Sequence, residues 1–140
     1  MNTVRIQLQT WHKRFAGYVR ARDFAGGLKM FDPDCRCFGT LIEFAENRER
    51  LLQSQWIPIW SGTRSFRFLA APFEVILSED RRLACVLTLW ESKGVAAGKK
   101  TFARRGRCSM VLRRGDGKSA RWLAVHTHFS IKPNAKLQPL

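Results

Sequence analysis

The sequence predicts an α+β fold in which N-terminal helices pack on one face of a strongly curved, mainly antiparallel sheet. Apolar residues recur at the spacing of a helix face up to about residue 22. From residue 64 onward, β-branched and aromatic residues dominate several runs that are bounded by turn residues. Helices that precede a series of strands are typical of the α+β class, in which one helix layer covers one sheet face.

The first helix is expected over residues 4–22, and Thr3 can cap its start. Its apolar positions share one face: Val4, Leu8, Trp11, Phe15 and Tyr18 or Val19. Asp23 can cap a short second helix over residues 24–30. Both helices would turn their apolar residues toward the same core.

A strand over residues 34–38 and a third helix over residues 43–55 are expected next. The helix is dense in Glu and Arg, which indicates a solvated outer face. Pro58 and the Ser61-Gly62 pair predict a break in the chain before the sheet begins.

The sheet is expected to contain strands over residues 64–77, 83–91, 102–114 and 121–131. The first would bend at Pro72, and the last two would form a hairpin around Gly115-Asp116-Gly117.

The last strand carries large residues on both of its predicted faces. One set is Trp122, Ala124, His126, His128 and Ser130, and the other is Leu123, Val125, Thr127, Phe129 and Ile131. The domain's own helices can cover only one face. We therefore expect a second copy of the chain to cover the other, with His126 and His128 in the interface of a homodimer.

The hairpin, over Val111–Gly117 and Trp122–Ser130, contains a basic pair, a turn, a tryptophan and a His-x-His-x-Ser pattern. The hairpin resembles that of the nuclear transport factor 2-like superfamily, in particular SnoaL-like and ketosteroid-isomerase-like bacterial proteins and the association domain of calcium/calmodulin-dependent protein kinase. The resemblance extends from Trp11 to the C-terminal strand, and Asp23-Phe24, Phe31-Asp32-Pro33 and Ala84-Cys85 occur within it in the expected order. It implies a single SnoaL-like domain over residues 1–140, a cone-shaped sheet with an internal pocket, and a dimer formed by the opposite face.

Composition is consistent with this expectation. A chain of 140 residues with 45% hydrophobic residues is long enough for a single folded domain. No run approaches the ~20 apolar residues of a membrane span, and no signal-peptide core is present, so we expect a cytoplasmic protein without a membrane partner. The cysteines, which are Cys35, Cys37, Cys85 and Cys108, are expected to be reduced and buried.

The net charge of +14 favours an anionic partner. A basic patch could be formed by Lys99, Lys100, Arg104, Arg105, Arg107, Arg113, Arg114, Lys118 and Arg121. A nucleic-acid or anionic-partner binding module is therefore an alternative function, with a solvated basic face as the simpler interpretation. An oligomerisation module, like the kinase association domain, is a further alternative.

Catalysis in the resembled superfamily implies a carboxylate that abstracts a proton beside a carbonyl group. Its family position falls at about Phe38 or Gly39, and neither residue is a base. Asp32 and Asp34 are the remaining candidates, although a turn or cap role is the main expectation for both. Whether the chain is an enzyme stays open. If it is one, the resemblance implies an isomerase, dehydratase or cyclase that needs no cofactor.

The resemblance also implies a ligand pocket. Arginines that line the cavity of the kinase association domain correspond to Trp90, Ser109 and Phe129 here, so the ligand is expected to be small and apolar. The expected pocket residues are Tyr18, Trp90, Arg107, Ser109, Thr127 and Phe129, with Arg107 as the anchor for a carbonyl or carboxylate. The alternative is that the large aromatic residues fill the cone and leave no cavity.

Cys35 and Cys37, together with His126 and His128, have the residue types of a tetrahedral zinc site. Zinc ligand pairs usually have wider spacings, and the resembled superfamily carries His-x-His without metal. We therefore expect no metal and interpret the histidines as interface residues.

Overall fold

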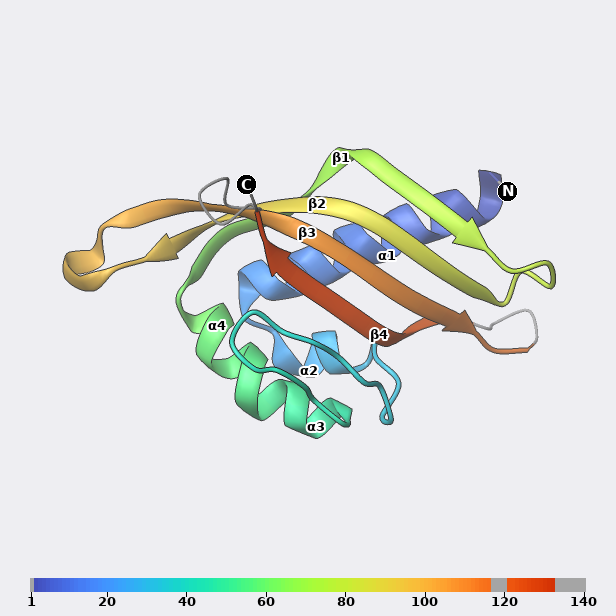
Figure 1. The fold of residues 1–140 in the computed structure, drawn as a ribbon, viewed down its shortest axis with the longest axis horizontal. Coiled ribbons are helices and arrows are strands. Elements are labelled where there is room, and N and C mark those ends of the chain that lie inside the picture. The colour runs from blue at the N-terminus through green and yellow to red at the C-terminus, as the bar shows by residue number, and fades with distance from the viewer. Residues whose placement is uncertain (1, 117–120, 133–140) are drawn as a thin grey trace, which may run out of the picture.

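The computed structural model describes residues 2–116 and 121–132, and Figure 1 shows their arrangement. The helical elements are α1 (Asn2–Ala21), α2 (Phe24–Leu28), α3 (Arg48–Leu51), a π-helical turn (Leu52–Trp56) and α4 (Ile57–Ser61). The strands are β1 (Thr63–Leu77), β2 (Leu83–Val95), β3 (Thr101–Arg114) and β4 (Trp122–Ile131), with a 3₁₀ turn (Ala97–Lys99) before β3. Helices followed by an antiparallel sheet of order β1-β2-β3-β4 confirm the predicted α+β class.

The first two helices follow the predicted pattern closely. The buried face of α1 includes the expected apolar residues, and Val19 rather than Tyr18 completes it. Thr3 lies inside the helix and is not its cap. Asp23 caps α2 as predicted, because its Oδ1 accepts a hydrogen bond of 2.9 Å from the backbone N–H of Gly26.

The segment predicted as a strand over residues 34–38 is irregular and runs alongside β4. Backbone N–H groups of Arg36 and Phe38 donate to carbonyl oxygens of β4 at 3.0 and 2.9 Å. Cys37 pairs with Ala45 through two backbone hydrogen bonds, so residues 43–46 run back beside this segment. They are therefore not part of the third helix, contrary to the prediction.

The third helical segment begins at Arg48, after Asn47, whose side chain caps it by accepting a hydrogen bond from the backbone of Arg50. It then continues through Pro58, where a break was predicted. The π-helical turn pairs the N–H of Ile57 with the carbonyl of Leu52, five residues earlier. Pro58 consequently lies in the first turn of α4, where its missing N–H is tolerated, and the helix ends before Gly62.

The sheet curves around the helices, which all lie on its inner side in Figure 1. The pairing of β1 with β2 shifts register between Phe68 and Phe73, across the predicted bend at Pro72. Leu8, Phe15 and Phe31 meet Val86, Met110 and Leu112 of the sheet in the core between the layers. In the part of the chain that the structure describes, no helix is both long and apolar enough to cross a membrane.

A bulge in β4 changes the faces that were predicted for this strand. Val111 pairs with His126, but Leu112 pairs with Ala124, so Val125 is an extra residue. Ala124 and Thr127 are consequently both buried on the inner face, although strict alternation would place them on opposite faces. The inner face of β4 therefore begins with residues of one predicted set, such as Trp122, and ends with residues of the other set, such as Thr127.

Candidate ligand-binding cavity

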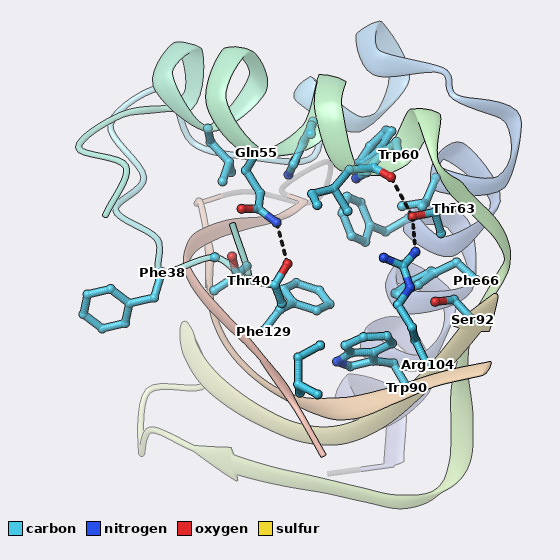
Figure 2. Close-up of a pocket in the computed structure, with 18 residues that line it drawn as sticks. Phe38, Thr40, Gln55, Trp60, Thr63, Phe66, Trp90, Ser92, Arg104 and Phe129 are labelled. Atoms are coloured by element: carbon cyan, nitrogen blue, oxygen red, sulfur yellow. Dashed lines mark hydrogen bonds between the residues drawn. The ribbon is translucent and has the colours of Figure 1, made fainter. Parts of the chain in front are cut away.

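A cavity of about 70 Å³ lies between the helices and the inner face of the sheet (Figure 2). Aromatic rings form most of its wall: Phe15, Trp56, Trp60, Phe66, Trp90 and Phe129. Pockets for drug-sized ligands usually exceed about 300 Å³. The rings therefore fill much of the cone and leave space only for a small molecule.

These rings pack against one another, which limits their movement. Trp56 and Trp60 are stacked with ring centroids 4.5 Å apart. Trp90 lies 5.9 Å from Phe66 and 6.3 Å from Phe129, measured between ring centroids. The indole Nε1–H of Trp90 also donates to the carbonyl of Arg107 at 3.2 Å, which sets the orientation of this ring.

One end of the cavity is organised by Gln55. Its Oε1 accepts hydrogen bonds from the backbone N–H groups of Leu41 and Ile42 at 2.9 and 3.2 Å, and its Nε2 donates to Thr40 at 2.9 Å. A side chain at Gly39 would overlap the amide of Gln55. The amide of Gln55 thus fills the space beside Gly39, one of the two positions to which the resemblance assigned a catalytic carboxylate.

The other end contains a cation. Arg104 Nη2 donates to Thr63 Oγ1 at 2.7 Å, and this hydroxyl donates to the carbonyl of Ile59 at 2.7 Å (Figure 2). The Nε of Arg104 and the Oγ of Ser92 are both buried and have no hydrogen-bond partner within the described structure. Burial lowers the pKa of Arg104 from its ordinary value, but an arginine remains protonated in a protein.

The described lining of the cavity contains no Asp, Glu or His. Besides the indole N–H groups of its tryptophans, its side-chain hydrogen-bonding groups are one guanidinium, one amide and a set of hydroxyls, which are Thr40, Thr63, Ser92 and Thr127. These groups can bind and orient a ligand, whereas proton abstraction near neutral pH requires a base with a suitable pKa.

The predicted pocket residues separate into two groups. Trp90, Thr127 and Phe129 line the cavity, whereas Tyr18 lies beside α2 and Met30, outside it. Arg107 and Ser109 lie on the outer face of the sheet, in a groove that also includes His128. This corrects the expected anchor: β3 turns its even-numbered residues inward, so Arg104 rather than Arg107 reaches the cavity. Arg104 shares its strand face with the apolar residues Cys108, Met110 and Leu112, but this alternation alone does not say which face the helices cover.

The two candidate catalytic carboxylates lie outside the cavity. Asp32 Oδ1 accepts a hydrogen bond of 2.8 Å from the backbone of Asp34, and its Oδ2 pairs with Arg113 at 2.9 Å. Asp34 is exposed. This geometry is that of an Asx turn with an ion pair.

His126 and His128 project from the outer side of β4, where the ring of Phe38 packs against both at centroid distances of 5.5 and 5.2 Å. Cys35 and Cys37 are buried on the inner side, away from these rings. A hydrogen bond from Cys35 and others from Thr127 lower the pKa of Cys37 to about 7. Among the residues that the structure describes, no three His, Cys, Asp or Glu side chains form a group that could hold a metal.

The basic residues do not form the single patch that was expected. Arg104 and Arg113 lie toward opposite ends of β3, about 30 Å apart at the usual rise of a strand. Arg104 also points inward, and Lys118 lies outside the described residues.

Comparison with solved structures finds similar folds over nearly the whole chain. An NTF2-like superfamily protein from Salmonella enterica serovar Typhimurium has a TM-score of 0.79 and 16% identity, over 97% of this chain and 96% of that one. A ketosteroid isomerase-like protein from Erwinia carotovora has a TM-score of 0.75 and 12% identity, over 96% and 100%. A candidate dehydratase of the NTF2-like family from Streptomyces avermitilis has a TM-score of 0.76 and 16% identity, over 95% and 99%.

These identities are low, so the three structures establish a shared fold and not a shared reaction. Comparison with curated protein sequences gives no match. The family model of the SnoaL-like domain matches residues 8–133, which is most of the chain. The chain therefore belongs to the SnoaL-like domain family and has the fold of the NTF2-like structures that it resembles.

Proposed function

We propose that this protein binds a small organic molecule, largely apolar, in the cavity between its helices and its sheet. The observation that carries the proposal is a ring of aromatic side chains with hydrogen-bonding groups at both ends of the cavity. An apolar wall with a few placed polar groups is the usual composition of a small-molecule site.

Binding is favoured over acid–base catalysis because the described lining offers no carboxylate or imidazole. Two of the similar structures are called ketosteroid isomerase-like and a candidate dehydratase. Such chemistry in this chain would need a base, and the amide of Gln55 beside Gly39 cannot act as one.

The proposal can be tested with a small neutral probe, 4-fluorobenzyl alcohol, observed by fluorine NMR. Phe129→Trp would fill part of the cavity with a larger ring. Phe44→Trp is the matched control, because Phe44 is exposed and does not line the cavity. We expect saturable binding that Phe129→Trp abolishes and Phe44→Trp preserves.

A folded protein that shows no saturable binding of small aromatic probes, whether neutral or acidic, would contradict the proposal. The cone would then be a packed core without a ligand site.

We further infer that two copies of the chain pair through the outer face of the sheet. This face carries Ile76, Leu83 and Leu87, whose side chains are 61%, 45% and 39% exposed. An exposed apolar surface of this kind favours association. In a twofold-symmetric dimer, the second copy would contribute the same apolar residues to the interface. His126 and His128 lie on this face beside Phe38, which is itself 43% exposed.

A further inference from the structure

Two polar side chains meet at the β2–β3 end of the cavity, and each has a buried atom without a hydrogen-bond partner in the described part of the chain. Ser92 and Arg104 are directly opposed across the two strands, so their side chains leave the sheet side by side on the inner face (Figure 2). The unpartnered atoms are the Oγ of Ser92 and the Nε of Arg104. Each such atom costs free energy unless something in the cavity completes its hydrogen bonding.

The guanidinium of Arg104 is held in place without being neutralised. Its Nη2 is fixed by the hydroxyl of Thr63, whose own hydrogen is used in a bond to the carbonyl of Ile59. The Thr63 hydroxyl and the Ile59 carbonyl are both uncharged. The described residues provide no ion pair to Arg104, and the described lining of the cavity contains no carboxylate. The half-buried guanidinium is therefore positioned, and apart from the ring of Phe102, whose centroid lies 5.9 Å away, it has no charge-stabilising partner among the described residues.

A partner for both atoms must accept hydrogen bonds, and a negative charge on it would also pair with the guanidinium. An arginine offers only donors, and a serine hydroxyl can rotate to donate as well. A neutral carbonyl could accept both bonds but would leave the charge uncompensated. A carboxylate meets both requirements, and its bond to a guanidinium is among the stronger hydrogen bonds in proteins. Since Arg104 is the one cation in the described lining, a monoanion fits better than a dianion such as a phosphate monoester.

We propose that the ligand of this cavity is a small aromatic monocarboxylic acid. Its carboxylate accepts hydrogen bonds from Arg104 Nε and Ser92 Oγ, and its ring packs against Trp90 and Phe66, which flank this end of the cavity (Figure 2). This inference rests on the proposed binding function and adds to it the chemical class of the ligand.

A matched pair of probes tests the ligand class. 4-Fluorobenzoate and 4-fluorobenzyl alcohol have the same ring and differ in charge, and fluorine NMR measures both dissociation constants. The titrations are done at pH 7 and physiological salt, where loose attraction to the +14 chain is screened. We expect the acid to bind at least tenfold more tightly than the alcohol.

Arg104→Met should abolish this preference while the alcohol still binds. Arg107→Met is the matched control: it removes the same charge from the same strand, but on the outer face, and should leave the preference intact. Ser92→Ala should reduce the preference without abolishing it. Circular dichroism establishes that each variant is folded. If Arg104→Met does not fold, Arg104→Lys replaces it, because lysine keeps the charge but lacks the Nε–H and should weaken the preference.

The outcomes separate the two proposals. Equal binding of acid and alcohol would overturn the inference and leave the proposed binding function intact. Binding of neither probe would overturn both. A preference that Arg107→Met reduces as much as Arg104→Met would show attraction to the basic surface, and would also overturn the inference.

Discussion

The indole ring of Trp90 occupies the space that a side chain at Gly106 would fill. The two residues are direct partners across β2 and β3, and a Cβ on Gly106 would overlap both the indole and the backbone carbonyl of Ser130. The largest ring on the sheet side of the cavity is thus seated over a glycine. The position of the Trp90 ring in the cavity wall therefore depends on Gly106, which does not itself line the cavity.

Gly106→Ala should therefore destabilise the fold. The added methyl group cannot be accommodated by a backbone carbonyl, so either the indole or the strand must move, at a cost of about 1–3 kcal/mol in the free energy of unfolding. Gly62→Ala is the control, because a Cβ there would meet no atom within 4 Å. Chemical denaturation measures both. Similar midpoints for the two variants would contradict the description of this contact.

His12 predicts a specific loss of stability at acid pH. Its ring is buried, and its Nδ1–H donates to the carbonyl of Leu8 at 2.8 Å, while Nε2 has no partner in the described structure. Burial lowers the pKa of His12 from 6.5 to about 4. Between these values the unfolded chain binds a proton that the folded chain does not, so stability rises with pH over this window and is complete above about 6.5.

We expect His12 to contribute a stability loss of about 2–3 kcal/mol between pH 7 and pH 4.5, at 1.36 kcal/mol per pKa unit. His12→Leu should remove this contribution, so the free energy of unfolding of the variant should fall less over that range. Equal pH dependence in His12→Leu and the wild type would show that His12 does not titrate in this window.

His128→Glu should convert the expected dimer into monomers. The new carboxylate would be buried beside its symmetry mate in the proposed interface, where a charge without a partner is costly. Light scattering at micromolar concentration measures the mass. Lys13→Glu changes the sign of a charge on the exposed side of α1 and should leave the mass unchanged. A wild-type monomer, or a dimer that persists in His128→Glu, would refute this interface.

The four cysteines should differ sharply in reactivity. All four are free thiols; Cys35, Cys37 and Cys108 are buried, and Cys85 is half-buried. Burial raises the pKa of Cys108, and the hydrogen bond with Cys37 raises that of Cys35. Although the pKa of Cys37 is about 7, its thiolate is shielded from reagents.

A thiol reagent such as dithionitrobenzoate should therefore modify at most Cys85 in the native protein and all four thiols after denaturation. Cys85→Ser should remove the native reaction. More than one rapidly reacting thiol in the folded wild type would contradict the described burial.

Local periodicity was sufficient to predict the first two helices and the order of the four sheet strands. The predicted strands over residues 102–114 and 121–131 agree with β3 (Thr101–Arg114) and β4 (Trp122–Ile131) to within one residue at either end. The apolar face of α1 and the cap at Asp23 were also predictable. Each of these features depends on residues a few positions apart, which a single sequence displays directly.

The sheet face on which each side chain of the site lies depended on contacts between segments that are distant in the sequence. The register of β3 against β4 creates the bulge at Val125, which brings Trp122 and Thr127 to the same face. No residue near Val125 specifies the bulge, because it arises from the mismatch between two strands that are paired in space.

The sequence by itself thus determined the α+β class, the first two helices, the succession of the four sheet strands, and a fold in which aromatic residues gather inside a curved sheet. Only the tertiary structure decided that Arg104 enters the cavity while Arg107 leaves it, and that Gln55 occupies the space beside Gly39. The physical reason is that alternation along a strand defines two faces but does not say which one the helices cover. That choice is made by long-range packing of α1 and α4 against the sheet.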